Sequence, residues 1–119
     1  DRVAKKREIF EWYKECLQDV QEIKLMPELE DTRGNIWLTA LTFENSDYNK
    51  IMKALEEVNV ESRPLWKPMH MQPLFENSKA ITDGTSENLY NKGLCLASST
   101  TMTKDDVIMI CDVIKRNLG

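Results

Sequence analysis

Several classes of protein are excluded by what this sequence contains only in small amounts. Its 119 residues include 4 glycines and 4 prolines, too few for a collagenous or disordered chain, and 41% are hydrophobic. No window approaches the roughly 18 apolar residues that a membrane-spanning helix needs. Basic residues are not in excess, because 16 Lys and Arg stand against 20 Asp and Glu, and the net charge is −4. A surface for nucleic acid needs concentrated positive charge, so we expect neither nucleic acid nor a membrane as a partner.

Cysteine and histidine are equally scarce. The three cysteines, Cys16, Cys95 and Cys111, show no CxxC spacing, and an odd, scattered set is typical of reduced thiols in a cytoplasmic protein. His70 is the only histidine, which disfavours a His-rich zinc site and a self-contained Ser-His-Asp triad. We therefore expect no bound metal. Glycine-rich phosphate loops are also missing, which excludes Walker-type, dinucleotide-binding and kinase chemistry from these residues.

Length and composition predict a single domain over residues 1–119. A chain of 13.9 kDa with 30% charged residues can bury an ordinary hydrophobic core without disulfides or a structural metal. The sequence begins with Asp1 rather than methionine and enters a helical pattern at once, without the features of a signal peptide. We expect it to be a segment of a longer protein.

The first half of the sequence predicts two helices and two extended segments. Apolar residues at helical spacing predict an amphipathic helix over residues 3–20. After a charged turn region, the β-branched and aromatic run at residues 36–43 predicts a central strand. Asp47 and its neighbours can cap a helix over residues 47–58. A short extended piece over residues 60–63 should end at Pro64, whose ring fixes the backbone and which donates no hydrogen bond to a strand.

An irregular stretch follows over residues 64–85. It contains three prolines and several large apolar side chains, yet it shows neither helical nor strand periodicity. A structureless segment of that length inside a compact domain is uncommon and is usually a functional loop, a lid or a linker. Its aromatic and apolar content favours the loop or lid.

Beyond the irregular stretch, the pattern returns to regular structure. Ser86 is the expected cap of a short helix over residues 87–92, which Gly93 closes. Residues 94–96 then predict a buried strand.

Helices that alternate with short strands predict an α+β fold, with a small sheet of three or four strands and helices packed on one face. A terminal helix begins with a capping-box pattern at Thr103 and Asp106. Its apolar face should meet the strands in one core. The residues expected in that core are Leu38, Leu94, Leu96, Val107, Ile110 and Ile114.

Four residues with binding chemistry fall close together at the start of the irregular stretch. Arg63, Trp66, Lys67 and His70 supply two cations, an aromatic ring and an imidazole within eight residues. This combination suits an anionic, flat ligand, because the cations bind phosphate or carboxylate and the ring offers a stacking surface. Taken singly, each has a plainer explanation: a solvated lysine, a core tryptophan, a structural histidine. The clustering favours a binding site.

Two longer stretches carry a resemblance to a known family. They are RPLWKPMHMQPLF at residues 63–75 and SENLYNKGLCLASST at residues 86–100, and a capped terminal helix follows them. With the opening helix and the NIWLT run at residues 35–39, the whole chain resembles the C-terminal small domain of the DegT/DnrJ/StrS family of pyridoxal-phosphate-dependent sugar-nucleotide aminotransferases. It is most similar to the branch that makes 4-amino sugars from UDP- or GDP-linked 4-keto-6-deoxy sugars, usually for bacterial surface glycans.

The resemblance implies a homodimeric enzyme whose large N-terminal domain holds pyridoxal phosphate and usually takes its amino group from glutamate. No catalytic residue and no cofactor are therefore expected in this segment. The residues that form the wall facing the nucleotide sugar would be Arg63, Trp66, Lys67 and His70. Asn35, at the start of the central strand, is a further candidate. Many family members have Pro and Gly where this chain has Ala97 and Ser99, which affects the expected local backbone there.

A different class of function fits the same residues. A small α+β domain with a long loop also suits a stand-alone module that binds a small ligand or mediates dimerisation without catalysis. The reading frame upstream of Asp1 distinguishes the two hypotheses. A large cofactor-binding domain encoded there favours the aminotransferase, and a start codon near Asp1 favours the module.

Overall fold

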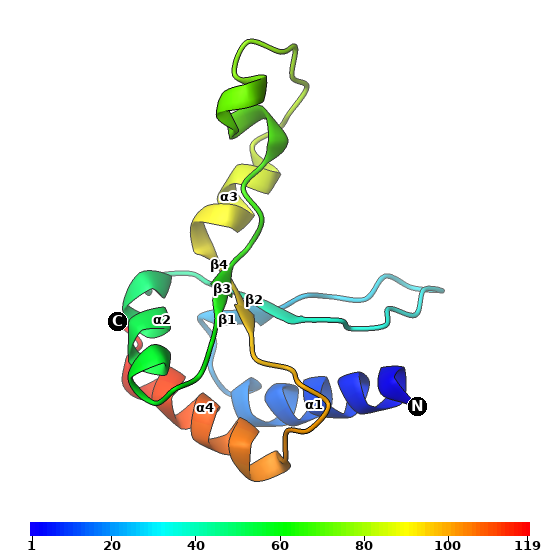
Figure 1. Ribbon diagram of the computed structural model, residues 1–119, viewed down its shortest axis with the longest axis vertical. Coiled ribbons are helices and arrows are strands. Elements are labelled where there is room, and N and C mark those ends of the chain that lie inside the picture. The colour runs from blue at the N-terminus through cyan, green and yellow to red at the C-terminus, as the bar shows by residue number, and fades with distance from the viewer.

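A computed structural model describes residues 1–119 and shows a four-stranded antiparallel sheet with helices along one face (Figure 1). The strands, in the spatial order β1-β2-β4-β3, are β1 (Ile23–Leu25), β2 (Thr39–Phe43), β3 (Arg63–Pro64) and β4 (Gly93–Leu96). The helices are α1 (Arg2–Leu17), α2 (Tyr48–Glu57), α3 (Thr85–Lys92) and α4 (Lys104–Arg116). The predicted α+β class with a small sheet is confirmed. None of these helices combines the length and the apolar character needed to span a membrane.

The first predicted helix is confirmed as α1, although it ends three residues earlier than expected. Its N-terminus is capped by Asp1, whose carboxylate accepts a hydrogen bond from the Val3 N–H at 3.0 Å. After Leu17 the chain turns, because the Val20 N–H donates to the Leu17 carbonyl and the Ile23 N–H donates to the Val20 carbonyl. Val20 therefore belongs to the turn that leads into β1.

The sequence correctly predicts how α2 and α4 begin. Asp47 precedes α2, and its carboxylate accepts a hydrogen bond from the Asn49 N–H at 2.9 Å. Thr103 precedes α4 and forms the expected capping box with Asp106, whose carboxylate accepts from the Thr103 N–H at 2.8 Å. Hydrogen bonds from Thr103 also lower the pKa of the Asp106 carboxyl.

The predicted central strand is confirmed only in part, because β2 starts at Thr39 rather than at residue 36. Ile36 has a φ of +48°, a left-handed conformation that a β-branched residue adopts only under strain. The chain therefore turns at Ile36 and joins the sheet three residues later. Strand β1 was not predicted at all, and it pairs with β2 through Ile23 opposite Phe43.

The third extended segment also differs from its prediction. Pairing starts at Arg63, opposite Cys95, and includes Pro64, opposite Leu94, instead of ending before the proline. Strand β3 lies at the edge of the sheet, where a proline is tolerated because one side of the strand makes no ladder hydrogen bonds. The Leu65 N–H then donates to the Gly93 carbonyl at 3.3 Å and continues the pairing.

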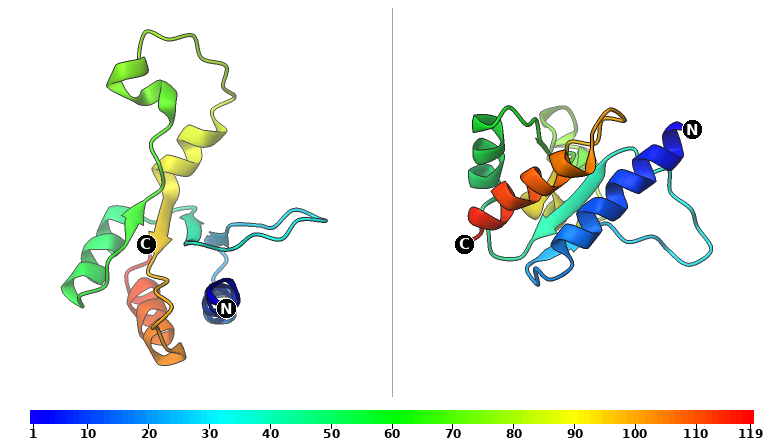
Figure 2. Two further views of the ribbon diagram at one scale, coloured as in Figure 1. Left: turned by 45° about the vertical axis from the view of Figure 1, so that its right-hand side comes forward. Right: turned by 90° about the horizontal axis from the view of Figure 1, so that it is seen from below.

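Helices α1, α2 and α4 cover one face of the sheet, and Figure 2 shows α1 and α4 side by side across it. Side chains from these helices and from alternate strand positions form a single core. Of the residues predicted for it, Leu94, Leu96 and the three from α4 are confirmed. Leu38 was predicted wrongly: it precedes β2, is half-buried and lines a hollow on the opposite face.

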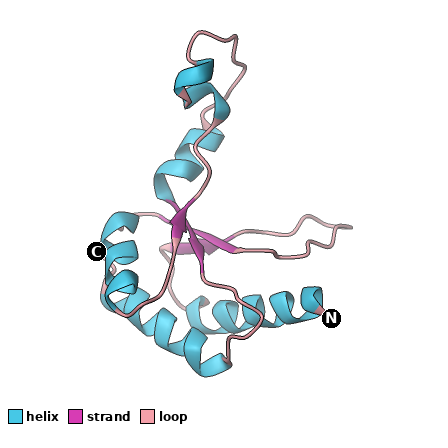
Figure 3. Cartoon of the chain, in the orientation of Figure 1, coloured by secondary structure: helices cyan, strands magenta, loops and turns pink.

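Residues 65–92 form an arm that extends away from one end of the sheet (Figure 3). The predicted loop occupies its outer part and contains two short 3₁₀ turns, Met69–Met71 and Pro73–Phe75. Large apolar side chains on the arm face solvent, including Leu74 at 83% exposure and Ile81 at 96%. The arm therefore has no core of its own.

The arm returns to the sheet through α3, whose start was predicted wrongly. The helix begins at Thr85, and Gly84, with a φ of +85°, occupies the cap position that was expected for Ser86. Gly93 follows the helix as expected, but in an extended conformation as the first residue of β4. A Cβ atom on Gly93 would lie 2.1 Å from Leu65 Cδ1 and 2.6 Å from the Leu89 carbonyl oxygen, so the close approach requires glycine.

Candidate functional site

The face of the sheet opposite the helices carries an open hollow, which we call the tryptophan pocket. It has a volume of about 580 Å³. Cys95 of β4 lies beneath it and is only 4% exposed, whereas its neighbours Leu94 and Leu96 point into the helical core. The other residues that define the pocket are Trp37, Leu38, Glu61, Arg63, Pro64, Leu65, Trp66, Lys67 and Tyr90.

Two exposed tryptophans form the centre of this surface. The ring centroids of Trp37 and Trp66 lie 6.2 Å apart with a tilt of 41°, a distance typical of aromatic contact. The two side chains are nevertheless 64% and 67% exposed. Both also border a neighbouring hollow of about 370 Å³. Exposed aromatic surface of this kind usually marks a binding or interaction site.

The loop over residues 26–38, which carries Trp37, is held against α1 by a charged contact. The Arg7 guanidinium donates to both carboxylate oxygens of Glu28 at 2.8 Å and to the Gly34 carbonyl at 2.5 Å. The Glu28 carboxylate also accepts from the Gly34 N–H at 2.6 Å. The Arg7 side chain and the Gly34 amide together lower the pKa of Glu28 to about 2. This network closes the loop and fixes its base.

Ile36 directs Trp37 toward the pocket. The left-handed backbone at Ile36 directs its own side chain into the interior, where it is 3% exposed. The side chain of Trp37 is consequently left on the surface. The Asn35 side-chain oxygen accepts a hydrogen bond from the Trp37 N–H at 3.3 Å. The Trp37 carbonyl in turn accepts from the Ser98 hydroxyl at 3.1 Å. Trp37 is thus positioned by contacts on both sides of its backbone.

Positive charge lies on both sides of the tryptophans. On the arm side, Lys67 is exposed and no carboxylate pairs with it, whereas Arg63 pairs with Glu61 at 2.6 Å. On the α1 side, Arg2 and Lys6 line a hollow of about 450 Å³ that also includes Asn35 and Trp37. This arrangement suits an anionic ligand that also presents a flat or apolar part.

Most of the site residues predicted from the sequence come together in the structure. Arg63, Trp66 and Lys67 line the tryptophan pocket, and Asn35 lines the two hollows that adjoin it. His70 does not line the pocket and lies farther along the arm in the first 3₁₀ turn.

Trp37 was missed as a site residue. If the alternation observed in β2 continued back to residue 37, Trp37 would lie on the buried face with Thr39, Leu41 and Phe43. The turn at Ile36 breaks this alternation, and the sequence carries no signal for that turn.

The departure from the family pattern at Ala97 and Ser99 lies next to this surface. The Tyr13 hydroxyl donates to the Ala97 carbonyl at 2.8 Å, and burial raises the pKa of that hydroxyl. The Ser99 and Thr101 hydroxyls are hydrogen-bonded to one another at 2.9 Å. The segment between β4 and α4 is therefore held in place without the proline and glycine.

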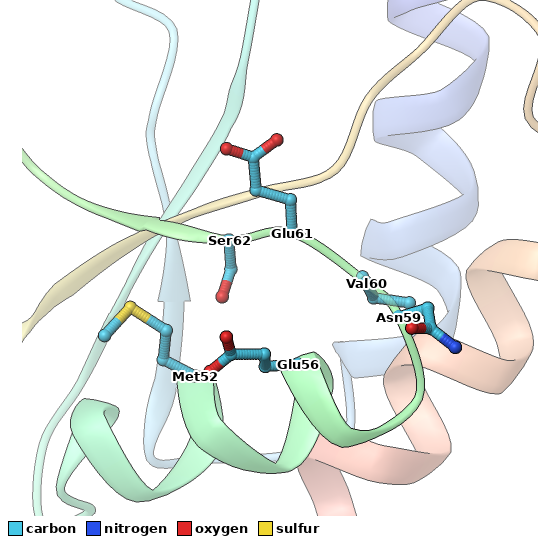
Figure 4. Close-up of a pocket in the computed structure, with 6 residues that line it drawn as sticks. All are labelled: Met52, Glu56, Asn59, Val60, Glu61 and Ser62. Carbon is cyan, nitrogen blue, oxygen red and sulfur yellow. The ribbon is translucent and has the colours of Figure 1, made fainter.

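A separate hollow, also of about 450 Å³, lies between α2 and residues 59–62 (Figure 4). Glu56 and Ser62 approach each other across it, and the buried Ser62 hydroxyl has no hydrogen-bond partner. Its charged lining residues are Glu56 and Glu61, with no cation among them. Two carboxylates repel an anionic ligand, so this hollow is a poorer site for phosphate chemistry than the tryptophan pocket.

Comparison with known proteins assigns the fold to a family. The family model described as the DegT/DnrJ/EryC1/StrS aminotransferase family matches residues 1–115. This chain belongs to that aminotransferase family. The resemblance of the RPLWKPMH run to the family is thereby confirmed.

Relatives and solved structures agree with this assignment. EpsN of Bacillus subtilis (strain 168), which carries the name of a pyridoxal phosphate-dependent aminotransferase, is 41% identical over 120 residues, covering 96% of this chain and 31% of EpsN. GDP-perosamine synthase of Vibrio cholerae is 30% identical, covering 97% of this chain and 32% of that protein. The crystal structure of the aminotransferase TlmJ from Streptoalloteichus hindustanus superposes with a TM-score of 0.83 at 18% identity, over 97% of this chain and 31% of TlmJ. The chain thus spans about a third of the length of these family members.

Pyridoxal phosphate is the cofactor that the family implies, and the residues around the tryptophan pocket do not fit it. The cofactor needs a lysine amine and an acidic partner for its ring nitrogen. Lys6 Nζ is occupied by the Ser98 carbonyl and hydroxyl, at 2.5 and 3.2 Å, and Lys67 lies exposed on the arm. The carboxylate at the pocket, Glu61, is paired with Arg63. No step of the cofactor's chemistry is therefore assigned to these side chains.

Proposed function

We propose that this chain is the C-terminal small domain of a pyridoxal-phosphate-dependent aminotransferase that aminates a nucleotide-linked 4-keto-6-deoxy sugar for surface-glycan synthesis. Its family membership and its similarity to EpsN support the aminotransferase part of the proposal. The similarity to a GDP-perosamine synthase supports a sugar linked to a nucleoside diphosphate. The proposal includes a cytoplasmic homodimer, glutamate as amino donor, and a cofactor held by the remainder of the parent protein.

Within that enzyme, we assign the tryptophan pocket to the nucleotide sugar. The observation that carries this assignment is the convergence of Arg63, Trp66 and Lys67 with Trp37 on one open hollow. The diphosphate provides the negative charge for the cations, and the base or sugar ring provides the flat surface for a tryptophan. His70 contributes from the arm, and Asn35 positions Trp37.

Substitution of the charged and imidazole side chains in the full-length parent tests this assignment. A hydrogen bond to a charged group contributes roughly 1.5–3 kcal/mol, so Lys67→Ala and His70→Ala should each weaken use of the nucleotide sugar about tenfold to a hundredfold. The measurement is the single-turnover rate of amination as the nucleotide-sugar concentration is varied. Lys79→Ala is the matched control, because Lys79 is an exposed lysine of the arm that lies outside both the pocket and the cluster of predicted binding residues at 63–70. If both variants keep a nucleotide-sugar affinity within about twofold of the parent, Lys67 and His70 have only a structural role.

The isolated 119-residue chain gives a second test. It has its own hydrophobic core, so it should fold, but it should neither retain pyridoxal phosphate nor transaminate. Absorbance of the cofactor after dialysis measures this directly. Cofactor that survives dialysis and is trapped by borohydride on a lysine of this chain would contradict the proposal that the remainder of the parent protein holds it.

The alternative function, a stand-alone binding or dimerisation module, also draws support from that self-contained core. The same pocket would then bind its ligand without any catalytic partner. The reading frame upstream of Asp1 separates the alternatives, because only the aminotransferase requires a cofactor-binding domain encoded in continuity with this chain.

A further inference from the structure

Three segments that are far apart in the sequence meet at the Ser98 side chain. Ser98 follows β4 and is only 5% exposed. The chain passes α1 here (Figure 1), and the ammonium of Lys6, in the second turn of α1, donates to the Ser98 carbonyl at 2.5 Å and to the Ser98 hydroxyl at 3.2 Å. The same hydroxyl donates to the Trp37 carbonyl at 3.1 Å. Hydrogen bonds therefore connect α1 to the tryptophan pocket through one buried serine.

Donor chemistry fixes the direction of these hydrogen bonds. An ammonium has three N–H donors and no acceptor, whereas a serine hydroxyl has one proton and can also accept. The Ser98 hydroxyl therefore accepts from Lys6 and keeps its single proton for the Trp37 carbonyl. Because a hydrogen bond from a charged donor is stronger than one between neutral groups, Lys6 holds the hydroxyl in this orientation.

The Trp37 backbone depends on this hydroxyl because it has few other partners. Trp37 lies in a bend between Ile36 and β2, and no hydrogen bond joins it to another backbone group. Its N–H donates to the Asn35 side chain at 3.3 Å, which is longer than the contact of its carbonyl with Ser98. The residue is also 64% exposed, so packing alone holds its ring only weakly.

We propose that Lys6 and Ser98 are positioning residues for the nucleotide sugar. Lys6 orients the Ser98 hydroxyl, the hydroxyl holds the Trp37 carbonyl, and the Trp37 ring is thereby kept against Trp66. Lys6 also lines a hollow beside the pocket, but two of its three donors are engaged by Ser98. Lys6 thus acts through Ser98 and not by contact with the substrate. The inference rests on the proposed assignment of the tryptophan pocket to the nucleotide sugar.

The geometry is tested on the 119-residue chain without any substrate. Two indole rings in contact couple their electronic transitions, and the resulting near-ultraviolet circular dichroism depends on their distance and tilt. A Trp12→Phe background leaves Trp37 and Trp66 as the only tryptophans. In that background, Ser98→Ala and Lys6→Met should each weaken the signal of the tryptophan pair. Lys6→Arg should keep the signal, because a guanidinium also only donates.

Lys5→Met is the matched control for these spectra. Lys5 is the neighbouring lysine of α1, is also half-buried, and pairs with Glu8 at 2.6 Å. It should leave the signal of the tryptophan pair unchanged. A signal that neither Ser98→Ala nor Lys6→Met alters would overturn the proposal. If Ser98→Ala does not fold, the comparison of Lys6→Met with Lys6→Arg decides the question.

Kinetics of the full-length parent test the consequence for the substrate. Loss of one hydrogen bond should raise KM for the nucleotide sugar about threefold to tenfold in Ser98→Ala and in Lys6→Met. The value of kcat should stay within about twofold of the parent, because the pocket binds the substrate without taking part in the chemical step. A lowered kcat at unchanged KM would overturn the proposal.

A double-mutant cycle separates positioning from direct contact. If Lys6 acts through Ser98, Lys6→Met should have no further effect on KM in the Ser98→Ala background. An effect that persists there would overturn the proposal, since Lys6 would then contact the substrate itself. Failure of the proposed function is distinguishable, because a parent that uses no nucleotide sugar would refute that function while the spectra still show whether Lys6 and Ser98 position Trp37.

Discussion

The two sides of this domain differ in how their apolar residues are used. On the helical side, Phe43, Ile51 and Ile114 are all 0% exposed and share one core with the strands. On the arm, Leu74 and Ile81 are 83% and 96% exposed. The first side is stabilised by contacts within the chain, whereas the second displays apolar surface that makes no such contacts. The difference separates residues that maintain the fold from residues available to a ligand or partner.

The junction between the two sides is narrow. The arm leaves the sheet after Pro64 and rejoins it at Gly93, and these two residues lie on adjacent paired strands. The geometry of the tryptophan pocket depends on this junction, because Trp66 follows it directly. Substitutions on each side, and at the junction itself, should therefore have different consequences.

The largest expected effect on the free energy of unfolding comes from a substitution in the helical core. Ile110 of α4 is 2% exposed, so Ile110→Ala removes buried methyl groups and leaves a cavity, which should destabilise the domain by about 2–5 kcal/mol. Ile81→Ala is the same substitution at a site that is 96% exposed, and it should leave the free energy of unfolding nearly unchanged. Urea unfolding of both variants measures the contrast. Equal midpoints for the two variants would show that α4 does not depend on this core.

A smaller effect is expected at the junction. A Cβ on Gly93 would lie 2.6 Å from the Leu89 carbonyl oxygen, which belongs to the helix backbone and cannot simply rotate away. Gly93→Ala should therefore destabilise the domain by about 1–3 kcal/mol and displace Leu65 with the adjoining Trp66. Gly34→Ala is the control, because its nearest contacts would be at 3.4 Å. Chemical denaturation gives the stability, and tryptophan fluorescence reports the displacement. A Gly93 variant as stable as the Gly34 variant would show that Gly93 does not pack tightly against the Leu89 carbonyl oxygen.

The same contrast explains which features could be predicted from the sequence. Helices α2 and α4 carry their own caps in Asp47 and in the Thr103–Asp106 pair, and these local signals gave their starting points. The apolar spacing of α4 likewise predicted its buried face. Strand β4, at Gly93–Leu96, was recognisable as a short, fully apolar run. These features depend on neighbours in sequence, which is why sequence reasoning finds them.

The missed features depend on contacts across the fold. Strand β1 has only three residues and exists because β2 pairs with it. Ile36 adopts a left-handed backbone because its side chain is buried and the Arg7 network closes the loop behind it, neither of which a local pattern indicates. Trp37 was consequently not predicted as a site residue. From the sequence, the candidate site was predicted in its contiguous part, Arg63 to Lys67, and at Asn35 through the family resemblance. Its second tryptophan required the structure.

The smallest effect should appear in acid and concerns the loop that brings Trp37 to the pocket. Contact with Arg7 and Gly34 lowers the pKa of Glu28 from an ordinary value of 4.5 to about 2 in the folded protein. The unfolded chain therefore binds the proton at higher pH than the folded chain. It follows that the stability from this carboxylate is full above about pH 4.5 and is lost as the pH falls toward 2.

Because the pair is partly exposed, the loss should be modest. The pKa values of other carboxyls, such as Glu44 and Asp106, are lowered as well, so they also contribute to the acid dependence. The difference in free energy of unfolding between the wild type and Glu28→Gln isolates the contribution of the Glu28 carboxylate. The two proteins should differ in stability near neutral pH and converge as the pH approaches 2. Trp37 fluorescence should change over the same range in the wild type only. Stability curves that stay parallel at every pH would show that the loop is held by its packing around Ile36 and not by the charged contact with α1.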